Sequence, residues 1–299
     1  VNLGTVSTTK TGGDGYVPVP YKDAVWGTYH YTLDGGYKGG SPVIWSADKK
    51  TGAMTSYNFG LGQRFLTPWI ADPIRVGGKL YAPGFLTPTN ATMTSYSSLP
   101  IGFACFDMDA KAPCATNWYP VGTAVNVTLV LSKGTSGVTA NTLMRMASLG
   151  QAQDGKFRMT SMTSTGAMLY TVNFASGAPV VESSNGMNIA GISMQAQSAD
   201  GKRIFTIEPG GTALRCTDTS TGSACAGWTN PTAISSASSS YRVIPVDVLN
   251  VVCVSDSLAS PAYAKKCFDM ATGAASGMNF NLSQNIAGPQ FRFNAAGTK

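Results

Sequence analysis

The sequence has few of the groups that enzymes use for acid–base chemistry. Charged residues make up 12% of the 299-residue chain, glutamate occurs twice, and the only histidine is His30. A single imidazole excludes a metal site with several histidine ligands, and no serine lies in a Gly-x-Ser-x-Gly elbow. Six of the thirteen aspartates belong to turn motifs, and among the remaining acids we consider only Asp34, Asp72, Asp247 and Glu208 as candidates. We therefore expect no catalytic residue, no metal and no cofactor.

Long apolar runs are also lacking. The densest run, around Val125 to Leu131, has the length of a strand, so we expect no membrane span. Gly and Pro interrupt the chain, and no 3.6-residue periodicity persists, which predicts an all-β protein nearly free of helices. The chain starts at Val1 without a visible signal peptide, so we expect either numbering that begins after processing or a fragment.

Concentrated positive charge is absent too, although the chain is basic overall. The 21 basic residues outnumber the 15 acidic ones and give a net charge of +6, but they are scattered. Aromatic residues do not alternate with them in a stripe, so we predict no specific nucleic-acid binding. A mild attraction to anionic glycans or cell envelopes fits this charge better.

What the sequence does contain is a short repeated motif. Asp-x-x-Thr-Gly occurs at residues 48–52, 218–222 and 269–273, and a softened copy, Asn-Phe-Ala-Ser-Gly, occurs at 173–177. Asp can cap its own turn through its carboxylate, and Gly can take the positive φ that closes a hairpin. A fifth copy within residues 105–114 lacks Thr-Gly, but it matches residues 216–225 in length and in both cysteines.

A second element precedes several copies of this motif. Residues 78–82, 154–160 and 200–207 each read as a Gly-Lys turn followed by a strand. The complete unit is therefore four antiparallel strands with an Asp turn between the last two, and it recurs roughly every 45 to 65 residues. Such a unit is typical of a β-propeller blade.

We accordingly predict a single β-propeller domain over residues 1–299, with five recognisable blades and six or more in all. The predicted blades span about 16–60, 66–121, 140–185, 190–232 and 240–283. A partial blade would combine 289–299 with 1–10, so that the termini close the ring; truncation of a longer chain is the alternative. The strand-like run 125–131 has no assigned partner here and is interpreted as part of a degenerate extra blade.

The repeats resemble the β-propeller blades of the quinoprotein-like and WD-type superfamilies, which carry an Asp-x-x-Thr-Gly turn between their outer strands. Quinoprotein repeats also place a Trp soon after the glycine, and Trp228 and Trp118 approximate it with an offset. The adjacent-cysteine pair of the quinoprotein dehydrogenases is absent from this sequence. The resemblance therefore implies architecture only.

The six cysteines fall into local pairs. Each pair straddles one hairpin or its loop, and the predicted disulfides are Cys105–Cys114, Cys216–Cys225 and Cys253–Cys267. An even count with local pairing favours an oxidising compartment, and no pair has the spacing of a zinc knuckle. Possible N-glycosylation sites at Asn90, Asn126 and Asn281 fit secretion if the source glycosylates. We predict an extracellular protein, either secreted or at the cell surface.

The best candidate for a binding surface is the glycine-rich segment 29–40. Its candidate contact residues are Tyr29, Tyr31, Asp34, Tyr37 and Lys38. Exposed tyrosines beside an acid can stack on sugars and hold their hydroxyls, and tyrosine is equally enriched at protein interfaces. The alternative is that these tyrosines pack between blades. The polar segment 86–99 is the second candidate loop.

The sequence thus predicts a non-catalytic binding or assembly module with an adhesive or structural surface. Its partner would be a protein or a glycan at the cell surface, or a second copy of the chain. A carbohydrate-binding lectin is one alternative. The other is a propeller enzyme with a site at the axial channel, acting as a quinoprotein-like oxidoreductase, a glycosidase or a lyase.

Overall fold

The chain is an all-β protein wherever its structure is described. The computed structural model describes residues 19–28, 44–61, 64–66, 73–87, 95–128, 146–189, 191, 195–207, 213–228, 232–234, 241–256 and 264–281. Within these ranges the only helical element is a single 3-10 turn, η1 (Asp247–Leu249). The expectation of an all-β fold is confirmed.

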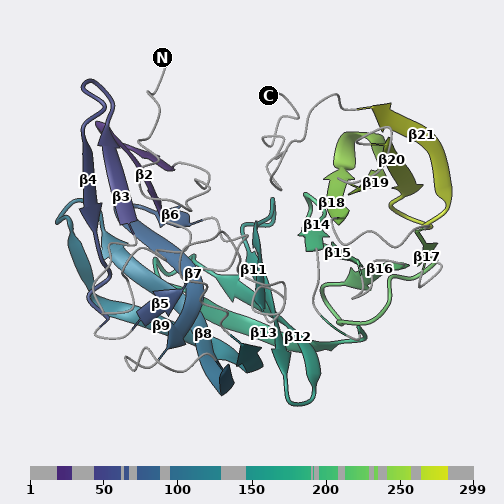
Figure 1. Cartoon of the computed structure of the whole chain (residues 1–299), viewed down its shortest axis with the longest axis horizontal. Coiled ribbons are helices and arrows are strands. Elements are labelled where there is room, and N and C mark those ends of the chain that lie inside the picture. Colours follow the sequence, from purple (N-terminus) through teal and green to yellow (C-terminus); the bar gives the residue numbers. More distant parts are fainter. Residues whose placement is uncertain are drawn as a thin grey trace. The chain divides into compact units, whose positions relative to one another are not determined.

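Four of the sheets are simple antiparallel meanders of four strands each (Figure 1). Sheet A contains β1 (Val19–Tyr21), β2 (Ala24–Thr28), β3 (Ile44–Asp48) and β4 (Met54–Tyr57). Sheet C contains β10 (Met146–Gln151), β11 (Phe157–Thr163), β12 (Gly166–Asn173) and β13 (Val180–Met187). Sheet D contains β14 (Gln195–Gln197), β15 (Arg203–Ile207), β16 (Ala213–Asp218) and β17 (Thr232–Ala233). Sheet E contains β18 (Tyr241–Val246), β19 (Val251–Asp256), β20 (Ala264–Asp269) and β21 (Ala275–Asn281).

Sheet B has five strands and is the largest. Its strands are β5 (Arg64–Leu66), β6 (Ile74–Val76), β7 (Lys79–Thr87), β8 (Ser95–Asp107) and β9 (Ala112–Thr128). Both β5 and β6 pair with β7, so they share the place of one first strand. The five sheets have the strand order of propeller blades, which confirms the predicted fold class, while the number of blades and the single-domain organisation stay predictions.

One detail of the predicted organisation was wrong. The run beginning at Val125 is not an unpaired piece of an extra blade but the last part of β9. Val127 lies opposite Tyr96 and Val125 lies opposite Ser98 on β8. The second loop candidate is correspondingly shorter than expected, because β7 and β8 extend over both ends of segment 86–99 and leave residues 88–94 between them.

The chain divides into two compact units. The first consists of Val1–Gly150 with Phe174–Val180, and the second of Gln151–Asn173 with Val181–Lys299. In the first unit, sheets A and B share an apolar core that includes Trp26, Leu80 and Phe106. In the second, sheets D and E share a core that includes Phe205 and Trp228, whose rings lie 5.5 Å apart. The sheets therefore pack through alternating apolar faces.

All three predicted disulfides form. They join Cys105 to Cys114, Cys216 to Cys225, and Cys253 to Cys267. The last pair lies directly opposite in the register of β19 and β20. Three disulfides in one chain indicate an oxidising environment.

Candidate functional site

The segment predicted to form the contact surface lies outside the described residues. This holds for its candidate residues Tyr29, Tyr31, Asp34, Tyr37 and Lys38, as well as for His30. The structure does describe the two strand ends that the segment joins. Thr28 ends β2 and Ile44 begins β3; the two residues pair with each other, and both are fully buried.

Each sheet has two different ends, and this difference organises the candidate site. We call the end that carries the Asp turns the turn end, and the opposite one the loop end. The connections between the second and third strands leave from the loop end. They cover residues 29–43 in sheet A, 88–94 in sheet B, 208–212 in sheet D and 257–263 in sheet E. Sheet C replaces this connection with a tight turn in which the Thr163 hydroxyl donates to the Gly166 carbonyl.

At the turn end, the Asp side chain organises the hairpin as the motif predicts. Oδ1 of Asp48 accepts hydrogen bonds from the backbone N–H groups of Lys50 and Thr51, at 2.9 and 2.7 Å, and from the Thr51 hydroxyl at 3.0 Å. The backbone N–H of Gly52 donates to the Asp48 carbonyl, and Gly52 has a φ of +70°. The sequence at residues 269–273 forms the same turn, with a glycine φ of +74°.

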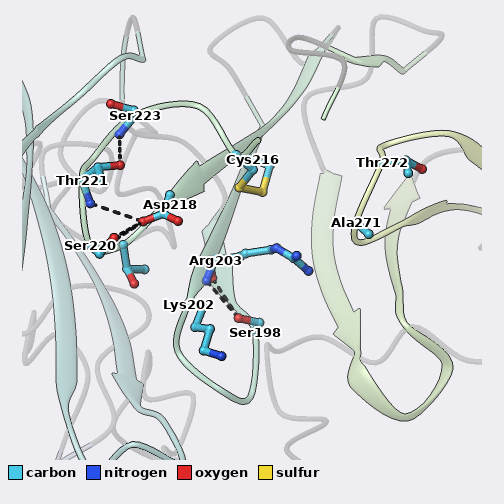
Figure 2. Close-up of a disulfide and its surroundings, with 12 residues drawn as sticks. Ser198, Lys202, Arg203, Cys216, Asp218, Ser220, Thr221, Ser223, Ala271 and Thr272 are labelled. Atoms are coloured by element: carbon cyan, nitrogen blue, oxygen red, sulfur yellow. Dashed lines mark hydrogen bonds between the residues drawn. A yellow bond between two sulfur atoms is a disulfide. The ribbon is translucent and has the colours of Figure 1, made fainter. Parts of the chain in front are cut away.

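Figure 2 shows the corresponding turn of sheet D beside its disulfide. Oδ1 of Asp218 accepts from the backbone N–H and the hydroxyl of Ser220 and from the N–H of Thr221. The Thr221 hydroxyl in turn accepts from the N–H of Ser223. Cys216 lies two residues before the Asp, so the disulfide fixes the strand that enters the turn.

The two remaining copies of the motif depart from this geometry. Asp107 caps the N–H groups of Asp109 and Ala110, but Lys111 takes the place of the glycine, with a φ of +51°. In the softened copy the backbone bond differs, because the Gly177 N–H donates to the Phe174 carbonyl, one residue later than in the motif. The Asn173 side chain also donates to Glu182.

A second interaction, which the sequence did not reveal, joins the Asp turn to the preceding turn of the same sheet. In each case the residue after the Asp donates its backbone N–H to the backbone carbonyl of another residue. That residue lies immediately before β2, β7, β15 or β19. The four bonds are Lys49 to Asp23, Met108 to Gly78, Thr219 to Lys202 and Met270 to Asn250, at 2.8 to 3.0 Å. The polar groups of the turn end are therefore engaged in building the sheets.

The hydrogen bonds of the turns lower the pKa of their carboxyl groups. For Asp48 the largest cause is the backbone N–H of Thr51, and for Asp218 it is the Ser220 hydroxyl. At Asp269, burial acts in the opposite direction, but the hydrogen bonds of the turn still hold its pKa below the usual value. These acids are stabilised in their ionised form.

Asp247 behaves differently, and it is the only one of the four candidate acids within the described residues. It begins η1 and accepts the backbone N–H of Ala199 from sheet D at 2.8 Å. Burial of the carboxyl group is the largest influence on its pKa and raises it, and the nearby charge of Asp200 adds to this, although the residue as a whole is exposed. Its observed role is to join sheets D and E. Asp34, Asp72 and Glu208 lie outside the described residues.

The shifted pKa values of these acids predict how the stability of the fold depends on pH. Because the folded-state pKa values of Asp48, Asp218 and Asp269 are lowered, their contribution is complete above the unfolded value near 4. It is lost as the pH falls through the folded values, so the free energy of unfolding should decrease on acidification below about pH 5. Urea denaturation between pH 7 and pH 2 measures this loss. Replacing all three by Asn, which keeps an acceptor oxygen, should flatten the slope.

Asp247→Asn serves as the control, because it should change the pH dependence of stability in the opposite direction. A raised folded-state pKa means that ionisation of Asp247 opposes folding, so its removal should make stability rise more steeply with pH across its titration range. If the triple Asn variant kept the wild-type slope, the Asp turns would not be the source of the acid sensitivity.

The other predicted site residues fall in different places. Asn126 is exposed on β9 and has a φ of +53°, Asn90 lies outside the described residues, and Asn281 is the last residue of β21. Within the described ranges, no three His, Cys, Asp or Glu residues gather closely enough to hold a metal ion. The described part of the chain also contains no helix with the length and apolar character needed to span a membrane.

Comparison with known proteins finds several solved structures that are similar in fold and low in sequence identity. No protein-family model matches the sequence, and no curated protein does. Its structure is similar to TolB from Acinetobacter baumannii, with 14% identity, a TM-score of 0.43, and coverage of 91% of this chain and 55% of that one. It is also similar to a Dos1 propeller, with 10% identity, a TM-score of 0.48, and coverage of 87% of this chain and 55% of that one. For apo AztD from Citrobacter koseri the identity is 12%, the TM-score is 0.44, and the coverage is 92% of this chain and 74% of that one.

The chain spans little more than half the length of the TolB and Dos1 structures it resembles. At such identities a likeness concerns the fold alone, so no functional residue is carried over from these proteins.

Proposed function

We propose that this chain is a secreted or cell-surface β-propeller that acts as a binding or assembly module through its loop end. The observation that carries the proposal is the contrast between the two ends of the sheets. The turn end repeats the same hydrogen bonds in sheets A, B, D and E. The loop end carries connections of different length and composition, which is where binding residues are usually placed on a rigid scaffold.

The segment 29–40 is the proposed contact region at this end. It joins two buried strand ends of sheet A, so its point of attachment is fixed. Its three tyrosines, Tyr29, Tyr31 and Tyr37, offer amphipathic rings, while Asp34 and Lys38 offer charges of both signs. This composition suits a protein partner or a second copy of the chain, because tyrosine is enriched at interfaces. The same rings would also stack on a glycan, which makes a lectin the alternative.

The three disulfides support an extracellular location for this activity, since such bonds persist in oxidising compartments. The exposed position of Asn126 on β9 is compatible with N-glycosylation there, as expected for a secreted glycoprotein in a glycosylating source.

We expect Tyr37→Ala to weaken binding at least tenfold without changing the thermal unfolding midpoint by more than about 2 °C, as an exposed interface anchor would. Self-association is measured by sedimentation velocity over a concentration series, and glycan binding on a glycan array. Lys50→Ala is the matched control, because Lys50 is exposed at the turn end of the same sheet. A wild-type protein that stays monomeric and binds no glycan, or equal loss in both variants, would contradict this assignment.

A further inference from the structure

A cluster of buried polar side chains lies where sheets C and D meet in the second unit. Thr160 on β11 is fully buried, and its hydroxyl donates to Oε1 of Gln195 on β14 at 2.6 Å. Gln195 is 5% exposed and pairs directly with Thr206 on β15, which is 0% exposed. Residues directly opposite in an antiparallel pair project from the same face, so all three side chains belong to this contact.

Two polar atoms of the cluster have no hydrogen-bond partner among the described residues. They are Nε2 of Gln195 and Oγ1 of Thr206. Exchanging the oxygen and nitrogen of the Gln195 amide would not change this count, because one of its two polar atoms would still be left over. Buried donors and acceptors in native proteins are nearly always satisfied, by protein atoms or by ordered water.

This polar contact differs from the contacts between sheets A and B and between sheets D and E, where apolar side chains form the shared clusters. Thr160 lies on the face of sheet C that contacts sheet D, because its hydroxyl donates to Gln195 on β14. Sheet D therefore differs between its two faces: Phe205 packs into the apolar core with sheet E, while Thr206 faces sheet C with a hydroxyl.

We propose that this cluster is an internal water-binding site, in which an ordered water molecule bridges the side-chain amide of Gln195 and the hydroxyl of Thr206. The amide nitrogen of Gln195 can donate to the water, and the Thr206 hydroxyl can either donate to it or accept from it. A buried water with such polar partners is a permanent part of a fold and joins the sheets that contribute to it. The inference is independent of the proposed binding function.

A substitution that keeps nearly the same side-chain shape tests the proposal, because stability should fall if the water is present and should not fall if it is absent. Thr206→Val removes a hydroxyl without changing the volume much. If water bridges it to Gln195, the unfolding equilibrium constant should rise about five- to tenfold, as for the loss of a typical buried hydrogen bond. If the hydroxyl has no partner, the same change should leave the urea midpoint unchanged or raise it. Thr160→Val is the matched control, because it removes a hydrogen bond already present in the same cluster.

A crystal structure at a resolution better than 2 Å provides the direct readout. We expect water density within hydrogen-bonding distance of both groups in the wild-type protein, and its loss in Thr206→Val. The inference is overturned by wild-type density that shows no water there, or by an unchanged or raised urea midpoint in Thr206→Val while Thr160→Val lowers it.

Discussion

Reduction of the three disulfides should unfold the protein at 37 °C. The bridges join residues 9, 9 and 14 positions apart. Closing loops of this length restricts the unfolded chain by about 2.5 to 3 kcal/mol each, or about 8 kcal/mol for the three together. This is comparable with the whole stability of a typical domain, about 5 to 15 kcal/mol. Far-UV circular dichroism with and without a phosphine reductant measures the loss.

Removing a single disulfide should destabilise the protein much less. Replacing Cys253 and Cys267 together by Ser should cost about 3 kcal/mol and leave the protein folded at 25 °C. These two residues lie on neighbouring strands of one hairpin, so their loss loosens sheet E locally. A fully reduced protein that still melts within a few degrees of the oxidised one would refute the expectation. Thiol labelling of the denatured, unreduced protein provides the control and should detect no free cysteine.

The disulfides were predictable because each pair is local. Cys216 and Cys225 flank one Asp turn, and the turn itself is specified by four or five consecutive residues. Such features need no knowledge of distant contacts, and the same is true of the strands on either side of each turn. The repeat thus predicts sheets A to E and their strand order.

The error in β9 has an identifiable cause. This strand runs from Ala112 to Thr128 and contains Pro120 and Gly122, which read as a turn in the sequence. In the structure the pairing with β8 shifts register near this point and then continues as far as Thr128. A long strand with an irregularity is therefore easily divided into two segments when only local signals are used.

The contacts between sheets could not be predicted at all. The hydrogen bond from Thr160 to Gln195 joins residues 35 positions apart, and no motif links the two. The same holds for the ion pair between Lys22 and Asp109 and for the bond from Ala199 to Asp247. These contacts depend on how neighbouring sheets pack. The sequence contains no local signal for them.

One contact between sheets leads to the second large expected effect. Because of this contact, alanine substitution should destabilise the protein unequally at two glycines of the same motif. Gly222→Ala should destabilise the protein by about 3 kcal/mol, whereas Gly52→Ala should cost about 1 kcal/mol. Both glycines have positive φ, at +75° and +70°, so both alanines carry the strain of the left-handed conformation. At Gly52 nothing lies within 4 Å of the added Cβ, but at Gly222 the Cβ would collide with the backbone carbonyl of Gly186 on β13.

The collision at Gly222 is difficult to relieve, because the atom in the way is backbone and not the end of a flexible side chain. Asn185, the neighbour of Gly186, also donates through its side chain to the carbonyl of Ser220 in the same Asp turn, at 3.1 Å. Movement of β13 away from the new methyl group would therefore break this hydrogen bond. Urea denaturation of the two variants measures the difference. Equal losses would mean that only the left-handed backbone requires glycine in this motif, and that the Asp turn of sheet D does not pack closely against sheet C.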